Sequence, residues 1–294
     1  MNESLRAILA GLVDYAGLFP PARLSMEDAT RGYAEYHRAP ERWMLGRFVV
    51  AAARVDEFAA AAEPLLPLGG DAWRLAVLLD GREAHAVASI AAFNAAHRGA
   101  LCDTVEAKAA TTDDIARLAA TMRGSDLTMF VEVPVATDPT PLVDAIGARG
   151  LRAKIRLGGV TADAFPAPDR VARFLAACIR AKVPFKATAG LHHPLRGEYP
   201  LTYDADAPRG AMYGFLNVVL AAALLRDGES EQLASALLSE HDRSAIAFGD
   251  DGVRWRGHLF LTARLGQLRG TSLISVGSCS FAEPVAELRA WGWL

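Results

Sequence analysis

Charged side chains recur on four successive segments of the chain that read as buried strands. Side chains alternate between the two faces of a strand, and the apolar set of each segment must face the covering helices. The other face then carries a set of ionisable residues near the carboxyl ends of the strands: Glu106, Lys108, Glu132, Lys154, Arg156 and Lys186. Buried charges are expensive unless paired, and they mark active sites more often than structural sites. A structural ion-pair network, or strands that end earlier and leave the charges solvated, is the alternative.

Lysine is scarce in this chain, which makes its placement informative. Only four of the 31 basic residues are lysine, namely Lys108, Lys154, Lys182 and Lys186. Arginine is effectively always charged, whereas lysine can lose its proton and act as a base or a nucleophile. Three of the four lysines fall on the predicted inner surface, and Lys182 ends a predicted helix, where a cation suits the helix dipole.

The segment Val183–His193 concentrates the most chemistry. It places Lys186 inside a strand and Thr188 beyond it on the same face, and two histidines follow in the loop. A lysine that is shielded from water beside other cations is held more easily in its neutral form, and Lys154 and Arg156 would supply those cations. Neutral lysine attacks carbonyl groups and forms a Schiff base that acts as an electron sink. Lys186 is therefore the predicted nucleophile.

Two short segments resemble class I aldolases of the deoxyribose-phosphate aldolase kind. In that family the Schiff-base lysine lies in a sixth-strand motif of the form Phe-x-Lys-Thr-x-Thr-Gly, which Lys186, Thr188 and Gly190 resemble. Lys154 with Gly158-Gly159 is similar to the second lysine and glycine pair of the family. The order departs, because that second lysine belongs on the following strand and here lies on the preceding one. The resemblance implies imine chemistry and covers only these two segments.

The acidic residues and histidines admit two mechanisms. Glu106 and Glu132 suit a general acid–base pair, with His192 or His193 assisting, and Arg156 and Lys108 would hold an anionic group of the substrate. The same two glutamates with His192 also suit a divalent metal ion that assists enolisation. Simple neutralisation of the lysines by the glutamates is a third interpretation. No cofactor is expected in the first mechanism, and a divalent metal ion is expected in the second.

Two glycine-bearing strand exits are candidate anion-binding loops. One contains Gly158 and Gly159, and the other contains Gly277 and Ser278 before the last predicted helix. Backbone amides at such exits bind phosphate or carboxylate groups. Cys279 lies in the second exit, but no base stands beside it in the sequence, so we interpret it as a bystander.

The elements that position these residues alternate between strands and helices. The predicted strands are Arg47–Ala53, Arg74–Leu79, Ala100–Lys108, Leu127–Val133, Leu151–Leu157, Pro184–Ala189, Ser244–Phe248 and Ser272–Val276. The predicted helices are Asp56–Leu66, Arg82–Arg98, Thr112–Arg123, Pro139–Arg149, Pro168–Lys182, Pro208–Arg226 with Glu229–Glu240, Arg256–Leu268 and Phe281–Trp291. Eight such units predict a (β/α)8 barrel, the TIM barrel. The alternative, an open doubly wound sheet, lacks its usual Gly-x-Gly-x-x-Gly fingerprint.

The first 45 residues fall outside this count of strands. They contain the segment Asp14–Pro21 and a predicted helix at Met26–His37. We therefore expect a single domain in which residues 1–45 form an extension that covers one end of the barrel and residues 46–294 form the barrel. The connection Leu191–Ala207 is long for a barrel and is typical of a lid or binding loop.

Composition excludes several classes of function. The formal net charge of −3 provides no basic field for nucleic acid, and no apolar run reaches the roughly 18 residues of a membrane span. The N-terminus does not read as a signal peptide, and three cysteines in unrelated contexts suggest a reduced, cytoplasmic protein. The apolar end Leu288–Leu294 makes a homo-oligomer possible.

The sequence thus predicts an enzyme that acts on a small anionic carbonyl or carboxylate metabolite. The expected reaction is cleavage or formation of a carbon–carbon bond, or isomerisation, as in lyases of the aldolase type and isomerases. The metal-assisted lyase or isomerase keeps the same barrel site. A barrel that binds a small anion without chemistry is the alternative from another class.

Overall fold

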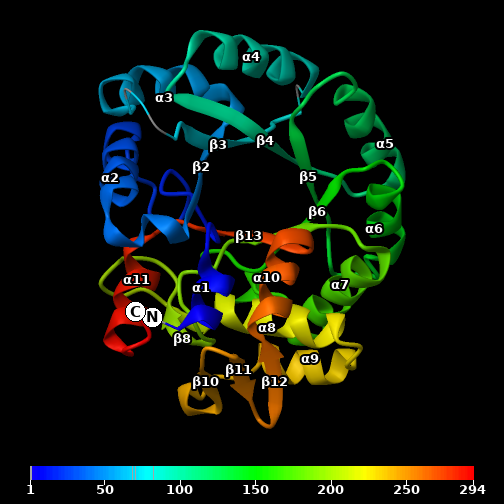
Figure 1. Ribbon diagram of the computed structural model, residues 1–294. Coiled ribbons are helices and arrows are strands. Elements are labelled where there is room, and N and C mark those ends of the chain that lie inside the picture. The colour runs from blue at the N-terminus through cyan, green and yellow to red at the C-terminus, as the bar shows by residue number, and fades with distance from the viewer. Residues whose placement is uncertain (1, 68, 70, 82) are drawn as a thin grey trace.

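The computed structural model describes residues 2–67, 69, 71–81 and 83–294 and contains a closed barrel of eight parallel strands (Figure 1). Around the barrel the strands follow the order β1-β13-β7-β6-β5-β4-β3-β2. They are β1 (Val13–Tyr15), β2 (Leu45–Ala51), β3 (Trp73–Leu78), β4 (Ala100–Lys108), β5 (Thr128–Glu132), β6 (Arg152–Arg156), β7 (Phe185–Thr188) and β13 (Leu273–Ser278). The predicted (β/α)8 architecture is confirmed.

Helices form the outer layer of the barrel, as Figure 1 shows. They are α1 (Glu3–Leu9), α2 (Met26–Arg38), α3 (Val55–Ala62), α4 (Glu83–Ala96), α5 (Thr112–Thr121), α6 (Thr140–Gly147), α7 (Pro168–Ala181), α8 (Phe215–Arg226), α9 (Glu231–Leu238), α10 (Thr262–Thr271) and α11 (Ala282–Ala290). Single 3-10 turns add Pro40–Met44, Ala52–Arg54, Glu63–Leu65, Ala162–Ala164 and Arg243–Ala245. The start of the predicted helix Arg82–Arg98 lies at Arg82, outside the described residues.

The first strand of the barrel comes from the segment that we expected to lie outside it. Val13 pairs with Val276 of β13 and with Leu45 of β2, so β1 closes the barrel between them. The expectation that residues 1–45 only cover the barrel is therefore wrong. Three residues, one of them a buried aspartate, give too short a pattern for a strand to be recognised by its alternation.

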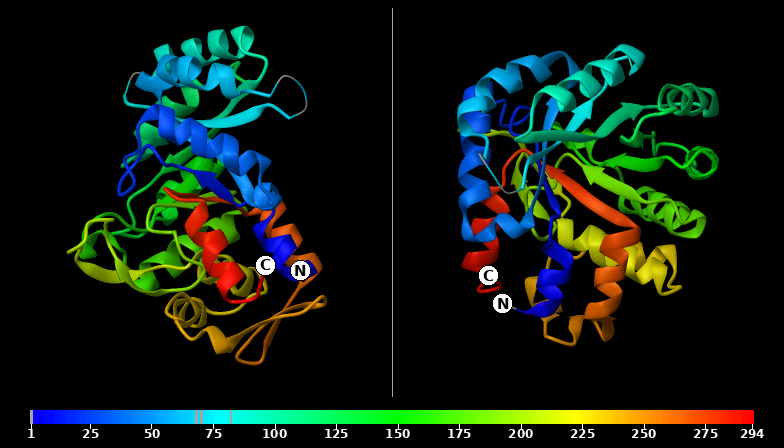
Figure 2. Two further views of the ribbon diagram at one scale, coloured as in Figure 1. Left: turned by 90° about the vertical axis from the view of Figure 1, so that its left-hand side faces the viewer. Right: turned by 45° about the horizontal axis from the view of Figure 1, so that its top comes forward.

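The predicted seventh strand, Ser244–Phe248, is not part of the barrel. Its residues Ile246–Phe248 form β10, which pairs antiparallel with β11 (Gly252–Trp255), and β12 (His258–Leu261) completes a separate sheet. Antiparallel strands need only a short turn, whereas parallel barrel strands need a long crossover. The sheet projects beyond the barrel beside α1 and α10 (Figure 2). The predicted helix Arg256–Leu268 is correspondingly too long, because helix α10 begins at Thr262.

The connection after β7 leaves the carboxyl end of the barrel and folds back on itself. It carries the antiparallel pair β8 (Gly197–Pro200) and β9 (Arg209–Met212), which projects from the barrel in the left view of Figure 2. The predicted helix Pro208–Arg226 is too long, since residues of β9 precede the helix and α8 begins at Phe215. Helix α8 is almost wholly buried because α9 and α7 pack over it.

Capping explains several of the helix boundaries. Thr111 and Asp114 form a reciprocal capping box at the start of α5. Ser280 accepts a hydrogen bond from the Glu283 N–H at the start of α11. Helix α7 ends at Lys182 in the left-handed conformation, with φ of 54°.

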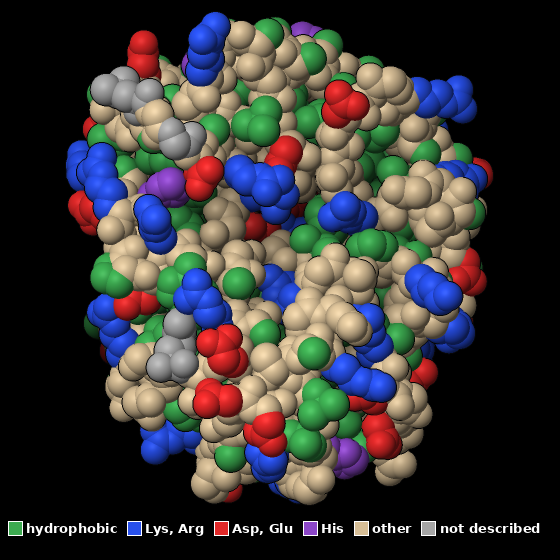
Figure 3. Space-filling view, in the orientation of Figure 1, with side chains coloured by type: hydrophobic (Ala, Val, Ile, Leu, Met, Phe, Trp, Pro, Cys, Tyr) green, Lys and Arg blue, Asp and Glu red, His purple; other side chains and the backbone are tan. Residues whose placement is uncertain are grey.

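The surface shows no extended region of one charge sign on the face drawn in Figure 3. Basic and acidic side chains alternate across it. None of the helices in the described ranges combines the length and apolar character needed to cross a bilayer. The three cysteines, Cys102, Cys178 and Cys279, are buried free thiols.

Candidate active site

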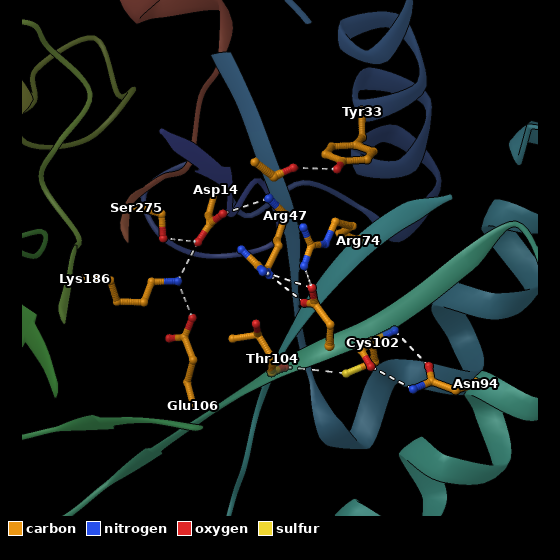
Figure 4. Close-up of polar contacts among 12 residues, drawn as sticks. Asp14, Tyr33, Arg47, Arg74, Asn94, Cys102, Thr104, Glu106, Lys186 and Ser275 are labelled. Atoms are coloured by element: carbon orange, nitrogen blue, oxygen red, sulfur yellow. Dashed lines mark hydrogen bonds and ion pairs between the residues drawn. The ribbon is translucent and has the colours of Figure 1, made fainter. Parts of the chain in front are cut away.

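Lys186 lies at the centre of a buried cluster of charges inside the barrel. Its side chain is 1% exposed, and its Nζ lies 2.6 Å from Asp14 Oδ2 and 2.6 Å from Glu106 Oε1 (Figure 4). The ammonium also lies 5.5 Å from the ring centroid of Phe130. β1, β4 and β7 supply the three charged residues, and all three point to the barrel axis because the alternate positions pack under the helices.

Lys154 continues the cluster on the neighbouring strand. It pairs with Lys186 in the register of β6 and β7. Its Nζ lies 2.6 Å from Glu106 Oε2 and 2.9 Å from Glu132 Oε2. Asp14, Lys186, Glu106, Lys154 and Glu132 therefore form a continuous series of alternating charges, which we call the charge chain. It contains three carboxylates and two ammonium groups.

Attraction between neighbouring opposite charges sets the protonation states of the residues in the charge chain. Burial alone would raise the pKa of Glu106, but the charges and hydrogen bonds of Lys154 and Lys186 outweigh it and lower that pKa to about 2. Burial alone would lower the pKa of Lys186, but Asp14 and Glu106 outweigh it and raise that pKa. The expectation that neighbouring cations hold Lys186 neutral is therefore wrong, because the nearest groups are carboxylates.

Asp14 is the member of the charge chain that sequence reasoning did not place. Its Oδ1 accepts a hydrogen bond of 2.7 Å from the Arg47 backbone N–H, and its Oδ2 accepts one of 2.7 Å from Ser275 Oγ. Gly46 allows this approach, since a Cβ there would lie 2.4 Å from Asp14 Oδ1. A buried carboxylate on a three-residue strand leaves little sequence signal beyond its position in the early Gly- and Pro-containing segment.

A cavity of about 110 Å³ opens over the charge chain at the carboxyl ends of the strands. Its polar wall consists of Glu106, Lys154, Arg156, Lys186, Thr188, His192 and Cys279, and the loop after β1 adds the apolar residues Ala16, Phe19 and Pro20. Three cations thus face the cavity against one carboxylate. This composition suits a small molecule that carries a negative charge.

The predicted substrate-binding residues divide between the cavity and its surroundings. Arg156 and Thr188 line it, and Arg156 Nε also donates to the Gly158 carbonyl at 3.0 Å. Within the described residues, Gly158 and Gly159 lie outside the cavity wall, and a Cβ at Gly158 would meet the ring of Phe165 at 2.5 Å. That glycine serves close packing of the loop.

Lys108 lies at the surface, away from the buried Lys154 and Lys186. Its side chain is 79% exposed, and its Nζ is 3.9 Å from Glu132 Oε1. It follows the inward pattern of β4 but extends past the last barrel layer into solvent. An ion pair with such an exposed lysine contributes about 0–1 kcal/mol to stability.

Both candidate residues of the second glycine-bearing strand exit, Gly277 and Ser278, lie at or beside the cavity. Gly277 lines the cavity and lies between Asp14 and Thr188 in the strand register. Ser278 is buried, donates from Oγ to the Ser280 carbonyl at 2.6 Å, and lies 3.3 Å from Nδ1 of His192. Ser278 therefore holds a histidine that faces the cavity.

The two adjacent histidines have different environments. His192 is buried in the cavity wall, and burial, with the charge of His193, lowers its pKa to about 4. His193 lies outside the cavity wall in the described part of the chain. Its ring stacks on Tyr199 with centroids 3.4 Å apart, and its Nδ1 contacts the Glu287 carboxylate. His193 thus connects the loop after β7 to α11.

Cys279 lies beside a histidine that the sequence did not indicate. Its Sγ lies 3.3 Å from His192 Nδ1 and 3.6 Å from the Tyr203 hydroxyl. Cys279 and His192 come from loops that are far apart in sequence, so only the fold brings them together. From the sequence alone we interpret Cys279 as a bystander, and the structure places the imidazole of His192 against its sulfur.

The proposed metal ligands do not converge. Glu106 and Glu132 both bind the Lys154 ammonium, and His192 contacts Ser278 and Cys279 instead. Within the residues that the structure describes, no group of three or more His, Cys, Asp or Glu side chains is arranged to hold a metal ion.

Comparison with models of known protein families and with curated proteins found no match to this chain. The fold and the geometry of the cavity are therefore the basis for any functional conclusion. A TIM barrel that carries its charged groups at the carboxyl ends of its strands has the arrangement in which enzymes of this fold place their active sites.

Proposed function

We propose that this protein is an enzyme that acts on a small anionic carbonyl metabolite through an imine with Lys186. The reaction is cleavage or formation of a carbon–carbon bond, or isomerisation. The observation that carries the proposal is a buried lysine in the wall of a cavity, with two carboxylates each 2.6 Å from its nitrogen.

The carboxylates provide the proton acceptor that imine formation needs. Lys186 rests as an ammonium because its pKa is raised, so its first step is transfer of a proton to Asp14, since the pKa of Glu106 is lowered to about 2. Since the charge chain has one carboxylate more than it has ammonium groups, this proton stays inside the chain. The neutral amine then attacks the substrate carbonyl, water leaves, and the protonated imine withdraws electrons from the adjacent bond.

The cavity supports the choice of substrate. Arg156 lies on the cavity wall with its guanidinium available to a carboxylate or phosphate, and Lys154 adds a second cation. A volume of about 110 Å³ suits a compact metabolite better than a nucleotide or a peptide. Phe19 and Pro20, on the loop after β1, add an apolar wall to the same space.

Lys154 is the second candidate for the nucleophile. With β1 counted as the first strand, Lys154 lies on the sixth strand of the barrel and Lys186 on the seventh. The aldolases that the two segments resemble carry their Schiff-base lysine on the sixth strand, which favours Lys154 by position. The local motif and the two flanking carboxylates favour Lys186, and the experiment below separates the two.

Borohydride trapping tests the proposal. The protein is mixed with small aldehydes, keto acids and sugar phosphates, reduced, and analysed by intact mass and peptide mapping. We expect an adduct on Lys186 that is absent in Lys186→Met and present in Lys108→Met, which removes an exposed lysine as a matched control. An adduct on Lys154 keeps the mechanism and moves the nucleophile.

The absence of any adduct across the panel contradicts the imine mechanism. Lys186→Arg then distinguishes the remaining possibilities, because arginine keeps the charge and cannot form an imine. Retained binding of an anionic ligand by Lys186→Arg, with no turnover by the wild-type protein, indicates a barrel that binds without chemistry.

A further inference from the structure

Cys279 and His192 form a second reactive group in the cavity that contains Lys186. Cys279 follows β13, His192 follows β7, and both side chains line the cavity. Ser275 of β13 pairs with Lys186 in the register of the two strands. Because Cys279 comes four positions after Ser275, its thiol lies nearer the mouth of the barrel than the Lys186 nitrogen. A substrate bound to that nitrogen and pointing to the mouth passes the thiol.

The hydrogen bonds around His192 favour one tautomer of its ring. Ser278 donates its hydroxyl hydrogen to the Ser280 carbonyl, so toward His192 Nδ1 it acts as an acceptor. Nδ1 therefore carries the hydrogen of the neutral ring. The Sγ of Cys279, 3.3 Å from the same Nδ1, lies in position to accept from that N–H.

The Tyr203 hydroxyl is a second polar group beside the sulfur. It lies on the connection between β8 and β9, and its hydroxyl is 3.6 Å from Cys279 Sγ. Two groups that can donate hydrogen bonds, from two loops, thus contact one sulfur that faces the cavity. Such donors stabilise a thiolate when it forms, although burial raises the pKa of Cys279 to about 11 and keeps the resting group a protonated thiol.

We propose that Cys279 is the group that gives a proton to, and takes a proton from, the substrate carbon next to the imine. This inference rests on the proposed imine with Lys186. In the giving direction the S–H bond breaks and a C–H bond forms, while the nitrogen lone pair of the enamine restores the C=N bond. The thiolate left behind accepts hydrogen bonds from His192 and Tyr203. In the taking direction the thiol first gives its proton to water, and the thiolate then removes a proton from the carbon, so that the C–H bond breaks and the S–H bond forms while the C=N electrons return to nitrogen.

In this proposal two separate sets of groups transfer protons, one at the lysine nitrogen and one at the substrate carbon. The charge chain handles the protons of Lys186 and of the leaving water, because its carboxylates contact the lysine nitrogen. Within the described residues, Cys279 and His192 have no hydrogen bond or ion pair to that chain. A neutral thiol is therefore available for the carbon atom while the charge chain stays ionised. His192 and Tyr203 are positioning residues, since they act through the sulfur.

Deuterium exchange into a trapped carbonyl compound tests this role. Wild-type protein, Cys279→Ala and the control Cys102→Ala are each incubated with pyruvate and with acetaldehyde in D₂O. Imine formation is followed by borohydride trapping, and exchange at the methyl carbon is followed by NMR. Cys102 is a suitable control because it is a buried thiol on β4, where its Sγ contacts the Thr104 carbonyl.

We expect Cys279→Ala to retain the Lys186 adduct and to lose exchange by about 100-fold or more, the usual contribution of a general acid–base group. Cys102→Ala should retain both. Cys279→Ser keeps a hydrogen-bonding side chain, which guards against loss of fold, and we expect it to lower exchange by at least about 10-fold because a hydroxyl is the weaker acid. A purely structural role for Cys279 would change trapping and exchange together.

The outcomes separate this inference from the proposed function. An unchanged exchange rate in Cys279→Ala, with the adduct retained, overturns the role of Cys279 and leaves the imine in place. Failure of the wild-type protein to trap either compound overturns this inference together with the imine on which it rests. Loss of the adduct in both Cys279 variants, with the fold retained, also overturns it, since the cysteine would then serve binding.

Discussion

Replacement of Lys186 by methionine tests whether the charge chain stabilises the fold as the contacts indicate. Methionine has a similar length, but it removes the ammonium that lies between Asp14 and Glu106 and over the Phe130 ring. Both carboxylates are almost completely buried, so neither gains a full shell of water in exchange. Removing one partner of a buried pair in this way destabilises a protein by about 3–5 kcal/mol.

The remaining contacts place the expected loss near the lower limit of that range. The fall in the pKa of Glu106 from 4.5 to about 2 corresponds to about 3 kcal/mol of stabilisation at neutral pH. Lys154 shares this effect with Lys186 and stays in contact at 2.6 Å. Asp14 keeps its hydrogen bonds from Arg47 and Ser275 but loses the ammonium in contact with it. We therefore expect a loss of about 3 kcal/mol for Lys186→Met.

Urea denaturation at pH 7 and at lower pH measures this loss. The pKa of Glu106 is lower in the folded state than in the unfolded state, so its contribution is present above about pH 4.5 and is lost as the pH falls toward 2. The difference in the free energy of unfolding between wild type and Lys186→Met should therefore shrink as the pH falls below 4.5. Lys108→Met is the matched control, and its exposed pair should change stability by about 0–1 kcal/mol.

Two results would refute this reasoning. One is a Lys186→Met protein that is as stable as the wild type at pH 7, because the buried carboxylates would then not depend on the ammonium. The other is an equal loss in Lys186→Met and Lys108→Met, because burial would then make no difference to the value of the pair.

Three further predictions concern Arg156, Glu240 and His192. Arg156→Ala should weaken trapping of pyruvate by about 10- to 100-fold and leave trapping of acetaldehyde unchanged, as concentration series of the adduct would measure, because only the keto acid carries a charge for the guanidinium. Glu240 is buried and accepts from Trp255 Nε1 at 3.0 Å, so Glu240→Gln should lower the free energy of unfolding by about 2 kcal/mol in urea with trapping unchanged. His192 has a folded pKa of about 4 against an ordinary 6.5, so the unfolded state binds the extra proton between these values and stability falls as the pH drops from 6.5 toward 4. Thermal unfolding across that range should show a smaller loss for His192→Gln than for the wild type.

The architecture could be predicted from the sequence because its signal is repeated. Strands such as Ala100–Lys108 are long, alternate clearly and are followed by amphipathic helices, and the structure gives that strand the same bounds. The predicted number of eight barrel strands agrees with the structure, although one of the predicted strands is not part of the barrel. The omitted β1 and the misassigned Ser244–Phe248 offset each other, because a count of alternating units does not identify each member.

The inward faces of the strands could also be predicted. Glu106, Lys154 and Lys186 lie together because the apolar partners on the same strands must pack under the helices. Their charge states could not be predicted in the same way. Those depend on which oppositely charged atom comes within about 3 Å, and a strand pattern gives the face of a residue but not the distance to its neighbours.

The contacts of Cys279 depended on loops, and loops carry little periodic signal. His192 and Tyr203 reach the thiol from the connection after β7, which folds back as β8 and β9. The sequence indicated that this connection was long enough for a binding loop, but it could not indicate where the loop returns. A histidine that is 87 positions away in sequence cannot be assigned to the thiol until the loop is placed.

Asp14 joins the closure of the barrel to the cavity. Its strand is held by β13 on one side and β2 on the other, and its carboxylate binds Ser275 of β13, the Arg47 N–H of β2 and the Lys186 ammonium of β7. One short strand therefore completes the hydrogen-bonded ring of the fold and delivers a proton acceptor to the predicted nucleophile. A longer apolar strand would close the barrel equally well, but it would leave Lys186 with Glu106 alone. Closure by itself does not require a buried carboxylate at this junction, whereas the proposed proton transfer from Lys186 does.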